Sequence, residues 1–200
     1  MRKEHLKVLV DDFLKGKYDS VLDVGSDQGD LRELLNPQRY VGIDVSSKAD
    51  LNLDLDKTDK LPFANGEFDL AFSSNLIEHL ENVHLVIDEI IRVGKLSVIT
   101  TPAAANWDTF WVLFRKKEHQ GDRKEFGKYF KYYGLPLEKP SDRHRWFFSY
   151  ADIVELIKYR AEKQGKKVEV FERYRSTKRK VLAMIFGKEL FASEIIFKIS

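Results

Sequence analysis

The sequence predicts an α/β fold with a doubly wound, mostly parallel sheet of seven strands and helices on both faces. Two observations predict it. Short apolar runs of strand length alternate with segments in which apolar residues recur at helical spacing. The first apolar run, residues 20–24, leads through a glycine-bearing turn at residues 25–29 into a helical segment, as at the ligand-binding edge of such sheets. Right-handed crossovers place the carboxyl ends of the parallel strands along that same edge.

The first hundred residues follow this alternation. Residues 2–15 have apolar positions at helical spacing and are followed by Gly16, a typical stop, so we expect a helix there. Strands are expected at residues 20–24, 39–44, 50–55, 68–73 and 95–100. Helices are expected at residues 29–35 and 76–93, and a turn at residues 61–66.

The pattern changes after Pro102. Residues 103–148 combine many aromatic with many basic side chains, which predicts a helical insertion after the fifth strand that would form a lid over a bound acceptor. We therefore expect a single domain in three parts: a ligand-binding half (1–102), the insertion (103–148) and a C-terminal helix with sheet-edge strands (149–200).

The C-terminal part is predicted in less detail. Ser149 fits the start of a helix that runs to about Gln164. Two strands are expected at the far edge of the sheet, at residues 168–172 and 180–186. The apolar residues of 189–200 fit a helix and a strand equally well.

Composition excludes several classes of protein. There is no cysteine, so disulfides, thiolate metal sites and a cysteine nucleophile are ruled out. A net charge of +2 provides no strong field for nucleic acid on its own. The sequence contains neither a run of about twenty apolar residues nor an apolar signal core behind the N-terminus. We therefore expect no membrane span and a cytoplasmic protein.

Acidic residues surround the glycine turn. Asp23, Asp27 and Asp30 lie on or beside it, whereas a pyrophosphate site needs bare amide groups without added negative charge. The turn therefore favours a ligand that has a positive charge and free hydroxyls over a dinucleotide. Asp44 lies 19 residues beyond Gly25, a spacing that suits a carboxylate bound to ribose hydroxyls.

Four segments occur in a characteristic order: Val-Leu-Asp-Val-Gly-Ser-Asp-Gln-Gly (21–29), Val-Gly-Ile-Asp (41–44), Leu-Pro-Phe-Ala-Asn-Gly-Glu-Phe-Asp (61–69) and Ser-Asn-Leu-Ile-Glu-His-Leu (74–80). In these segments the chain resembles the class I S-adenosylmethionine-dependent methyltransferases, and more narrowly their small-molecule branch, similar to methyltransferase type 11. They lie between residues 21 and 80, and they are specific together although each is weak alone. The resemblance implies a Rossmann-like fold, transfer of a methyl group and S-adenosyl-L-methionine as cofactor.

The resemblance gives the glycine loop a role. Gly25 and Gly29 would let the loop run beside the methionine part of the cofactor, and Asp23 would lie under it, near the amino group. The chain departs from the family at Asp27, because the middle position of this loop is usually glycine. A side chain there narrows the loop and adds negative charge, but aspartate tolerates turn geometry and can point to solvent.

Further cofactor contacts are implied beyond the loop. Asp44 would hold both ribose hydroxyls. Asp54 or Asp56, with the amide of Leu55, would meet the adenine, the alternative being that these aspartates are solvated turn residues. Asn75, just past the fourth strand, would lie near the methionine tail. The candidate cofactor-binding residues are Asp23, Gly25, Ser26, Gly29, Asp44, Val45, Asp54, Leu55 and Asn75.

Two histidines are candidates for catalysis. Methyl transfer is an in-line displacement that depends mainly on positioning. An alcohol acceptor must also lose a proton, commonly to a histidine, and His79 and His144 are the candidates. The alternatives are that His79 packs or hydrogen-bonds at the start of a helix and that His144 is a partly exposed loop residue. No metal site is predicted.

We expect the acceptor to be a small molecule, either an anionic or a sugar-containing metabolite, methylated at oxygen. Five basic residues of the insertion indicate that the acceptor is negatively charged: Arg115, Lys116, Lys117, Arg143 and Arg145. An ordinary solvated basic face is the alternative. The oligomeric state stays open, with a homodimer among the options.

Three other functions compete with this one. A nicotinamide dehydrogenase would share the glycine turn and Asp44, but it would not explain the segments at 61–69 and 74–80. A methyltransferase-like protein that only binds its ligand is motivated by Asp27. An RNA methyltransferase would use the basic insertion. The proline-containing signature of base amino-methylation is absent at residues 73–76, so nucleic acid is not the expected partner.

Overall fold

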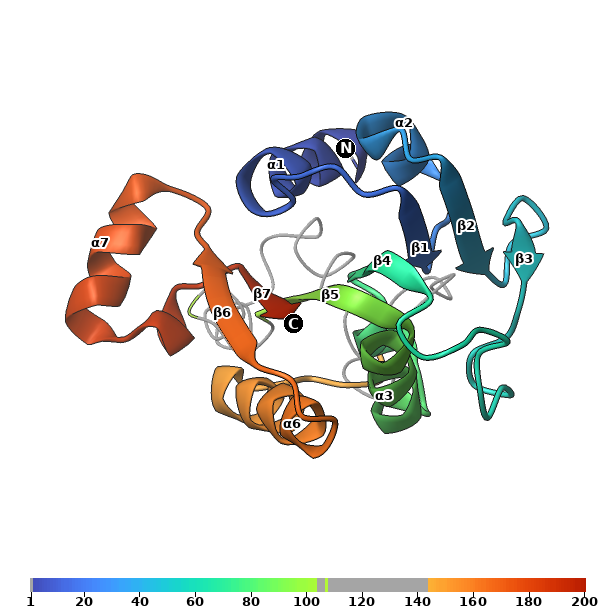
Figure 1. Cartoon of the computed structure of the whole chain (residues 1–200). Helices are drawn as coiled ribbons and strands as arrows, with labels where there is room; N and C mark the ends of the chain where they lie inside the picture. Colours follow the sequence, from blue (N-terminus) through green and yellow to red (C-terminus); the bar gives the residue numbers. More distant parts are fainter. Residues whose placement is uncertain (1, 104–106, 108–143) are drawn as a thin grey trace, which may run out of the picture.

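A computed structural model describes residues 2–103, 107 and 144–200, and in it a seven-stranded sheet has helices on both faces (Figure 1). The strand order is β3-β2-β1-β4-β5-β7-β6. The strands are β1 (Ser20–Val24), β2 (Arg39–Asp44), β3 (Leu51–Asn52), β4 (Phe68–Ser74), β5 (Gly94–Pro102), β6 (Val168–Arg173) and β7 (Glu194–Ile199). β1 to β5 pair in parallel, and β7 runs antiparallel to both β5 and β6. The predicted doubly wound, mostly parallel fold is confirmed.

Two apolar cores hold the layers together. Helices α1 (Arg2–Phe13) and α2 (Asp30–Leu35) cover one face, whereas α3 (Val83–Val93) and α6 (Tyr150–Lys163) cover the other (Figure 1). Because side chains alternate along a strand, Val21 faces the core beneath α1 and α2, whereas Leu22 faces the core beneath α3 and α6. Both side chains are fully buried, so β1 lies in the middle of a rigid sheet whose carboxyl edge can hold a site.

The helix predicted at residues 76–93 is wrong in its first third. A short 3₁₀ turn covers Ile77–His79, Leu80 is extended, and α3 begins only at Val83. The reason is a partner from another segment: the Asp56 carboxylate accepts hydrogen bonds from the amides of Glu81 and Asn82, at 2.8 and 3.1 Å. Apolar spacing continues across this break, so the pattern alone does not reveal it.

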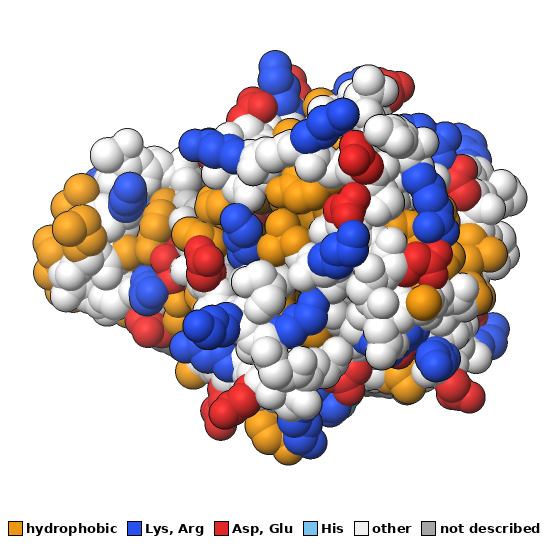
Figure 2. All heavy atoms as spheres, viewed as in Figure 1, with side chains coloured by type: hydrophobic (Ala, Val, Ile, Leu, Met, Phe, Trp, Pro, Cys, Tyr) orange, Lys and Arg blue, Asp and Glu red, His pale blue; other side chains and the backbone are white. Residues whose placement is uncertain are grey.

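The seventh strand was placed on the wrong segment. Residues 180–186 belong to a helix, α7 (Thr177–Phe186), whose start is capped by the Ser176 hydroxyl, which accepts from the Arg179 amide at 3.3 Å. The last strand is instead β7, from the segment whose apolar pattern left helix and strand open. α7 projects from the end of the sheet and carries exposed apolar side chains (Figures 1 and 2): Val181, Met184, Ile185 and Phe186.

Smaller differences concern the ends of elements. β3 is two residues long rather than six, because the chain leaves the sheet at Leu53 and turns at Asp54, whose carbonyl accepts from the Lys57 amide at 3.0 Å. The predicted start of α6 is confirmed, since the Ser149 hydroxyl accepts from the Asp152 amide at 3.1 Å.

The helical insertion predicted at 103–148 lies largely outside the described residues, and with it Arg115, Lys116, Lys117 and Arg143. Among the helices that are described, none is long and apolar enough to cross a membrane.

Candidate active site

The glycine loop follows β1 and bends back over the end of β2. Gly25 and Gly29 have positive φ angles of 81° and 73°, and the amide of Gly25 donates to the carbonyl of Ile43 at 2.8 Å. A Cβ atom at Gly25 would lie 3.0 Å from the nearest side-chain carbon of Leu76. The loop therefore passes close to the turn that follows β4, and only glycine allows this approach.

Asp23 lies in β1, two residues before Gly25, and is 3 % exposed. The Tyr40 hydroxyl donates to its carboxylate at 2.6 Å. Burial, with the charge of Asp23 as a second cause, raises the pKa of Tyr40 far above its usual value, so that Tyr40 stays a donor. The hydrogen bond from Tyr40 thus fixes the Asp23 carboxylate near the end of β1, and its contact with the cofactor stays a prediction.

The Asp44 carboxylate binds the glycine loop from the end of β2. One carboxylate oxygen accepts from the Asp27 amide at 3.0 Å, and the other accepts from the Ser46 amide at 2.9 Å. Each oxygen has a second lone pair, so the geometry leaves acceptor capacity for ribose hydroxyls. Asp27 has a φ of 48°, which explains why this position is usually glycine and why an aspartate is tolerated. The neighbouring Val45 is largely exposed.

The two aspartates proposed for the adenine contact lie in different surroundings. Asp54 faces solvent, and its hydrogen bond to Lys57 is the main cause that lowers its pKa. Leu55 is buried. Asp56 binds the amides of Glu81 and Asn82 and the Arg145 guanidinium instead, so it joins separate segments of the chain. Of the two, Asp54 remains the candidate for the adenine.

Asn75 connects the loop to a cavity of about 550 Å³. It has a positive φ of 51°, and its amide donates to the carbonyl of Thr100 at 3.0 Å, which turns the chain sharply at the end of β4. The Asn75 side chain lines the cavity, and the next residue, Leu76, contacts Gly25. The cofactor loop and the cavity are therefore neighbours.

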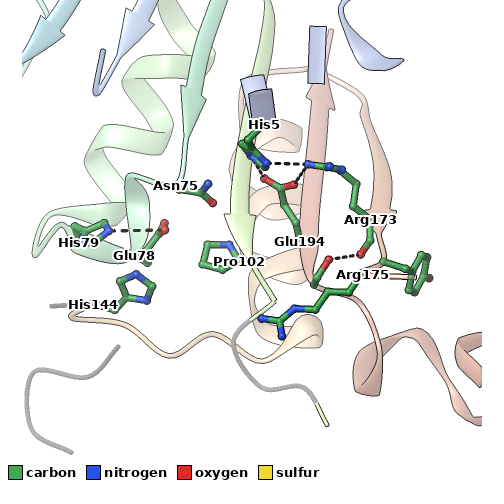
Figure 3. Close-up of a pocket in the computed structure, with 11 residues that line it drawn as sticks. His5, Asn75, Glu78, His79, Pro102, His144, Arg173, Arg175 and Glu194 are labelled. Carbon is green, nitrogen blue, oxygen red and sulfur yellow. Dashed lines mark hydrogen bonds and ion pairs between the residues drawn. The ribbon is translucent and has the colours of Figure 1, made fainter. Parts of the chain in front are cut away.

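One wall of the cavity brings together both predicted catalytic histidines (Figure 3). The rings of His79 and His144 meet edge to face with centroids 4.6 Å apart. Glu78 lies beside them, with its carboxylate oxygen 3.9 Å from Nε2 of His79, and is 1 % exposed. Its other oxygen accepts from the Thr101 hydroxyl at 3.4 Å. Glu78 was not among the predicted site residues, although its Glu-His-Leu segment was singled out.

The neighbours of His144 hold it against this wall. The amides of Arg145 and Trp146 donate to the carbonyl of Glu78 at 2.7 and 3.1 Å, and the Trp146 indole donates to the carbonyl of Leu80 at 2.5 Å. The Arg145 guanidinium binds the carbonyl of His79 and the carboxylates of Asp56 and Glu81. Arg145 was predicted to attract an anionic acceptor; its guanidinium is instead engaged in these structural contacts.

The opposite wall carries a charged group that sequence reasoning missed (Figure 3). Glu194 is 5 % exposed, and its carboxylate lies 2.9 Å from the Arg173 guanidinium and 3.0 Å from Nε2 of His5. Arg173 and Glu194 meet because β6 and β7 pair at these two positions. No local motif links residues 5, 173 and 194, so only strand pairing could have found this group. Arg175 lines the same wall.

A family model described as a methyltransferase domain matches residues 2–160. The chain belongs to this methyltransferase family. The resemblance inferred from the sequence is thereby confirmed. No curated protein matches.

Solved structures similar to this methyltransferase share its fold at low sequence identity. An S-adenosylmethionine-dependent methyltransferase from Mesorhizobium loti is 14 % identical, with a TM-score of 0.52 over 92 % of this chain and 91 % of that one. The small RNA methyltransferase HEN1 is 15 % identical, with a TM-score of 0.61 over 99 % of this chain and 25 % of that one. The [4+2]-cyclase SpnF is 14 % identical, with a TM-score of 0.55 over 98 % and 79 %. The fold alone therefore does not define the reaction.

Membership of the family implies S-adenosylmethionine as cofactor of this methyltransferase, and the residues present fit it. A side chain at Gly25 would fill the cradle between the loop and Leu76. The Asp44 carboxylate is held at the side of the loop and keeps acceptor capacity for hydroxyl groups. When bound, the cofactor supplies a methyl group on a cationic sulfur. The individual contacts with the cofactor stay predictions for all the candidate residues: Asp23, Gly25, Ser26, Gly29, Asp44, Val45, Asp54, Leu55 and Asn75.

Proposed function

We propose that this methyltransferase transfers the methyl group of S-adenosylmethionine to a hydroxyl oxygen of a small, anionic or sugar-containing acceptor bound in the cavity. One observation carries the proposal: residues 75–79 run from the cofactor loop to the polar wall. Leu76 contacts Gly25, and Glu78 and His79 line the cavity with His144. A hydroxyl placed against this wall would lie beside the cofactor.

The chain's own residues would position the acceptor and manage its proton. In the reaction the carbon–sulfur bond breaks, a carbon–oxygen bond forms, and the sulfur keeps the electron pair. The hydroxyl proton must leave, and His79 or His144 would receive it, since both imidazoles face the cavity. Positioning by the rigid turn after β4 would supply much of the rate enhancement, because in-line displacement needs alignment above all.

The opposite wall supports a negatively charged acceptor. Arg173 and Arg175 both line the cavity there. Glu194 balances the charge of Arg173 through an ion pair of 2.9 Å. We propose that Arg173 and Arg175, as cationic side chains of the cavity lining, attract an anionic group of the acceptor, in place of the basic residues that the sequence first indicated.

Methylation of RNA is the second candidate. A similar fold occurs in a small RNA methyltransferase, and an RNA end also offers sugar hydroxyls and negative charge to the same cavity. A third outcome, a protein that binds its ligand without catalysis, is motivated by Asp27 in the loop.

Two measurements test the proposal. Calorimetric titration should show binding of S-adenosylmethionine and no binding of NADH; binding of neither would sink the enzymatic function. Transfer of radiolabelled methyl should then be measured with hydroxylated sugar phosphates and with short single-stranded RNA. Label in the sugar phosphates supports the proposal, and label in RNA alone replaces it with the second candidate. Cofactor binding without transfer to either favours the third outcome.

His144→Ala should lower transfer at least tenfold, whereas the exposed His84→Ala should leave it unchanged.

A further inference from the structure

Three side chains on one wall of the cavity have the donors of a metal site. Glu78 contributes a carboxylate, and His79 and His144 contribute imidazoles. One ligand atom from each lies within 4.8 Å of the other two. Figure 3 shows the three gathered on the side of the cavity that also holds Asn75.

The distances fit a common ion. Bonds from a transition metal to imidazole nitrogen or carboxylate oxygen are about 2.0–2.2 Å long, so two ligands of one ion lie at most about 4 Å apart. The Glu78 oxygen and Nε2 of His79 are already 3.9 Å apart. All three ligand atoms lie within 4.8 Å of one another, so only small side-chain rotations are needed to bring them around one ion. Two imidazoles with one carboxylate suit Zn²⁺, Mn²⁺ or Co²⁺ better than Ca²⁺, which prefers oxygen ligands.

The side chains are also held in place, as metal ligands generally are. Glu78 is buried, and its second oxygen accepts from the Thr101 hydroxyl. His144 directly precedes Arg145 and Trp146, whose amides both bind the carbonyl of Glu78. Two of the three donors are therefore fixed to one another through the main chain, although they are far apart in the sequence. Contacts of this kind, made by residues that are not ligands themselves, hold the ligands in place and so reduce the entropy lost when they gather around an ion.

We infer that Glu78, His79 and His144 bind a divalent transition-metal ion on the acceptor side of this methyltransferase. The sequence predicted no metal site, because residues 80–143 separate His144 from Glu78 and His79. Binding of the ion stands on the donor geometry alone, whereas its use in catalysis rests on the proposed function. In that use, the ion would draw charge from the acceptor hydroxyl and favour release of its proton to solvent. The histidines would then act as ligands rather than as bases.

The binding test uses the untagged full chain without S-adenosylmethionine. Calorimetric titration with ZnCl₂, and electron paramagnetic resonance with MnCl₂, should show one ion bound per chain. Glu78→Gln and His144→Ala should each weaken binding at least tenfold, as expected for the loss of a ligand. His84→Ala removes an exposed histidine of α3 and should bind like the wild type. No binding by the wild type, or equal binding by both ligand variants, would overturn the inference.

A second readout covers variants that fold poorly. Circular dichroism without metal gives the melting temperature of each variant. If His144→Ala proves unstable, Glu78→Gln still tests the site, because glutamine keeps the shape of the glutamate side chain. Added Zn²⁺ should raise the melting temperature of the wild type and of His84→Ala, but not that of Glu78→Gln. An equal rise in Glu78→Gln would contradict the site. Methyl transfer that persists without bound metal would remove the catalytic use of the ion and leave the proposed function intact.

Discussion

The main-chain amide of Arg145 donates a 2.7 Å hydrogen bond to the main-chain carbonyl of Glu78, so two distant segments meet at the wall of the cavity. The side chain of Arg145 strengthens this junction through the carboxylates of Asp56 and Glu81. His144 and His79 face the same cavity because this junction exists. Loss of this junction should therefore lower catalysis by displacing His79 and His144, not by removing a group that takes part in the reaction.

We expect Arg145→Ala to lower kcat about tenfold or more while the Kd for S-adenosylmethionine changes less than twofold. The reason is that small misplacements of a reacting group are costly, whereas the glycine loop and Asp44 are untouched. Steady-state kinetics and calorimetry would measure the two quantities. Arg160→Ala breaks a comparable 2.8 Å ion pair, to Asp88 on α3, and serves as the matched control. Equal effects of the two variants on kcat would contradict a positioning role.

Much of the cofactor half could be predicted because its signals are local. The loop at 25–29 and Asn75 each directly follow a strand, and Asp44 is the last residue of one. Such a strand end is visible in the sequence as an apolar run followed by a turn. Parallel pairing then brings these ends to one edge. The roles of individual residues in cofactor binding still await measurement.

The acceptor wall could be predicted only in part, because its contacts are distant in sequence. His79 and His144 were chosen as separate candidates, and nothing in the sequence shows that their rings lie 4.6 Å apart. The break before α3 depends on Asp56, and the charged group around Glu194 depends on the pairing of β6 with β7. Tertiary hydrogen bonds decide these features, and no apolar period encodes them.

Asp44→Asn should weaken binding of S-adenosylmethionine about tenfold or more. The carboxylate accepts from two main-chain amides, and an amide side chain turns one of these acceptors into a donor. A charge-assisted hydrogen bond contributes about 1.5–3 kcal/mol, which corresponds to at least a tenfold change in Kd. Calorimetry would measure it, with the exposed Asp59→Asn as control. An unchanged Kd in Asp44→Asn would remove this residue from the cofactor site.

Asp69 should make stability depend on acidity. The hydrogen bond from Lys95, followed by that from the Ser20 amide, lowers the pKa of this carboxyl to about 2. A carboxyl whose pKa is lower in the folded chain stabilises the fold at pH values above its pKa in the unfolded chain, about 3.9. This contribution is lost as the pH falls through the lower pKa of the folded chain.

Asp69→Asn should therefore reduce the free energy of unfolding by about 1 kcal/mol at pH 7, a modest figure because the side chain is 30 % exposed and screened. Urea denaturation at pH 7, 4 and 3 would follow the difference between variant and wild type. It should be constant from pH 7 to about 5 and shrink below that. A difference that grows on acidification would show that Asp69 acts in another way.

Asp27→Gly should bind S-adenosylmethionine as tightly as the wild type or more tightly. At a φ of 48° glycine has no steric strain, the main-chain hydrogen bond from residue 27 to Asp44 is kept, and one negative charge leaves the loop. Asp27→Ala also removes the charge, but it keeps a side chain at positive φ and loses the local hydrogen bonding that favours aspartate there, so it should destabilise the fold by about 1 kcal/mol. Calorimetry and thermal melting of both variants separate charge from backbone strain. A large loss of affinity in Asp27→Gly, with the fold intact, would mean that the Asp27 carboxylate itself contacts the cofactor.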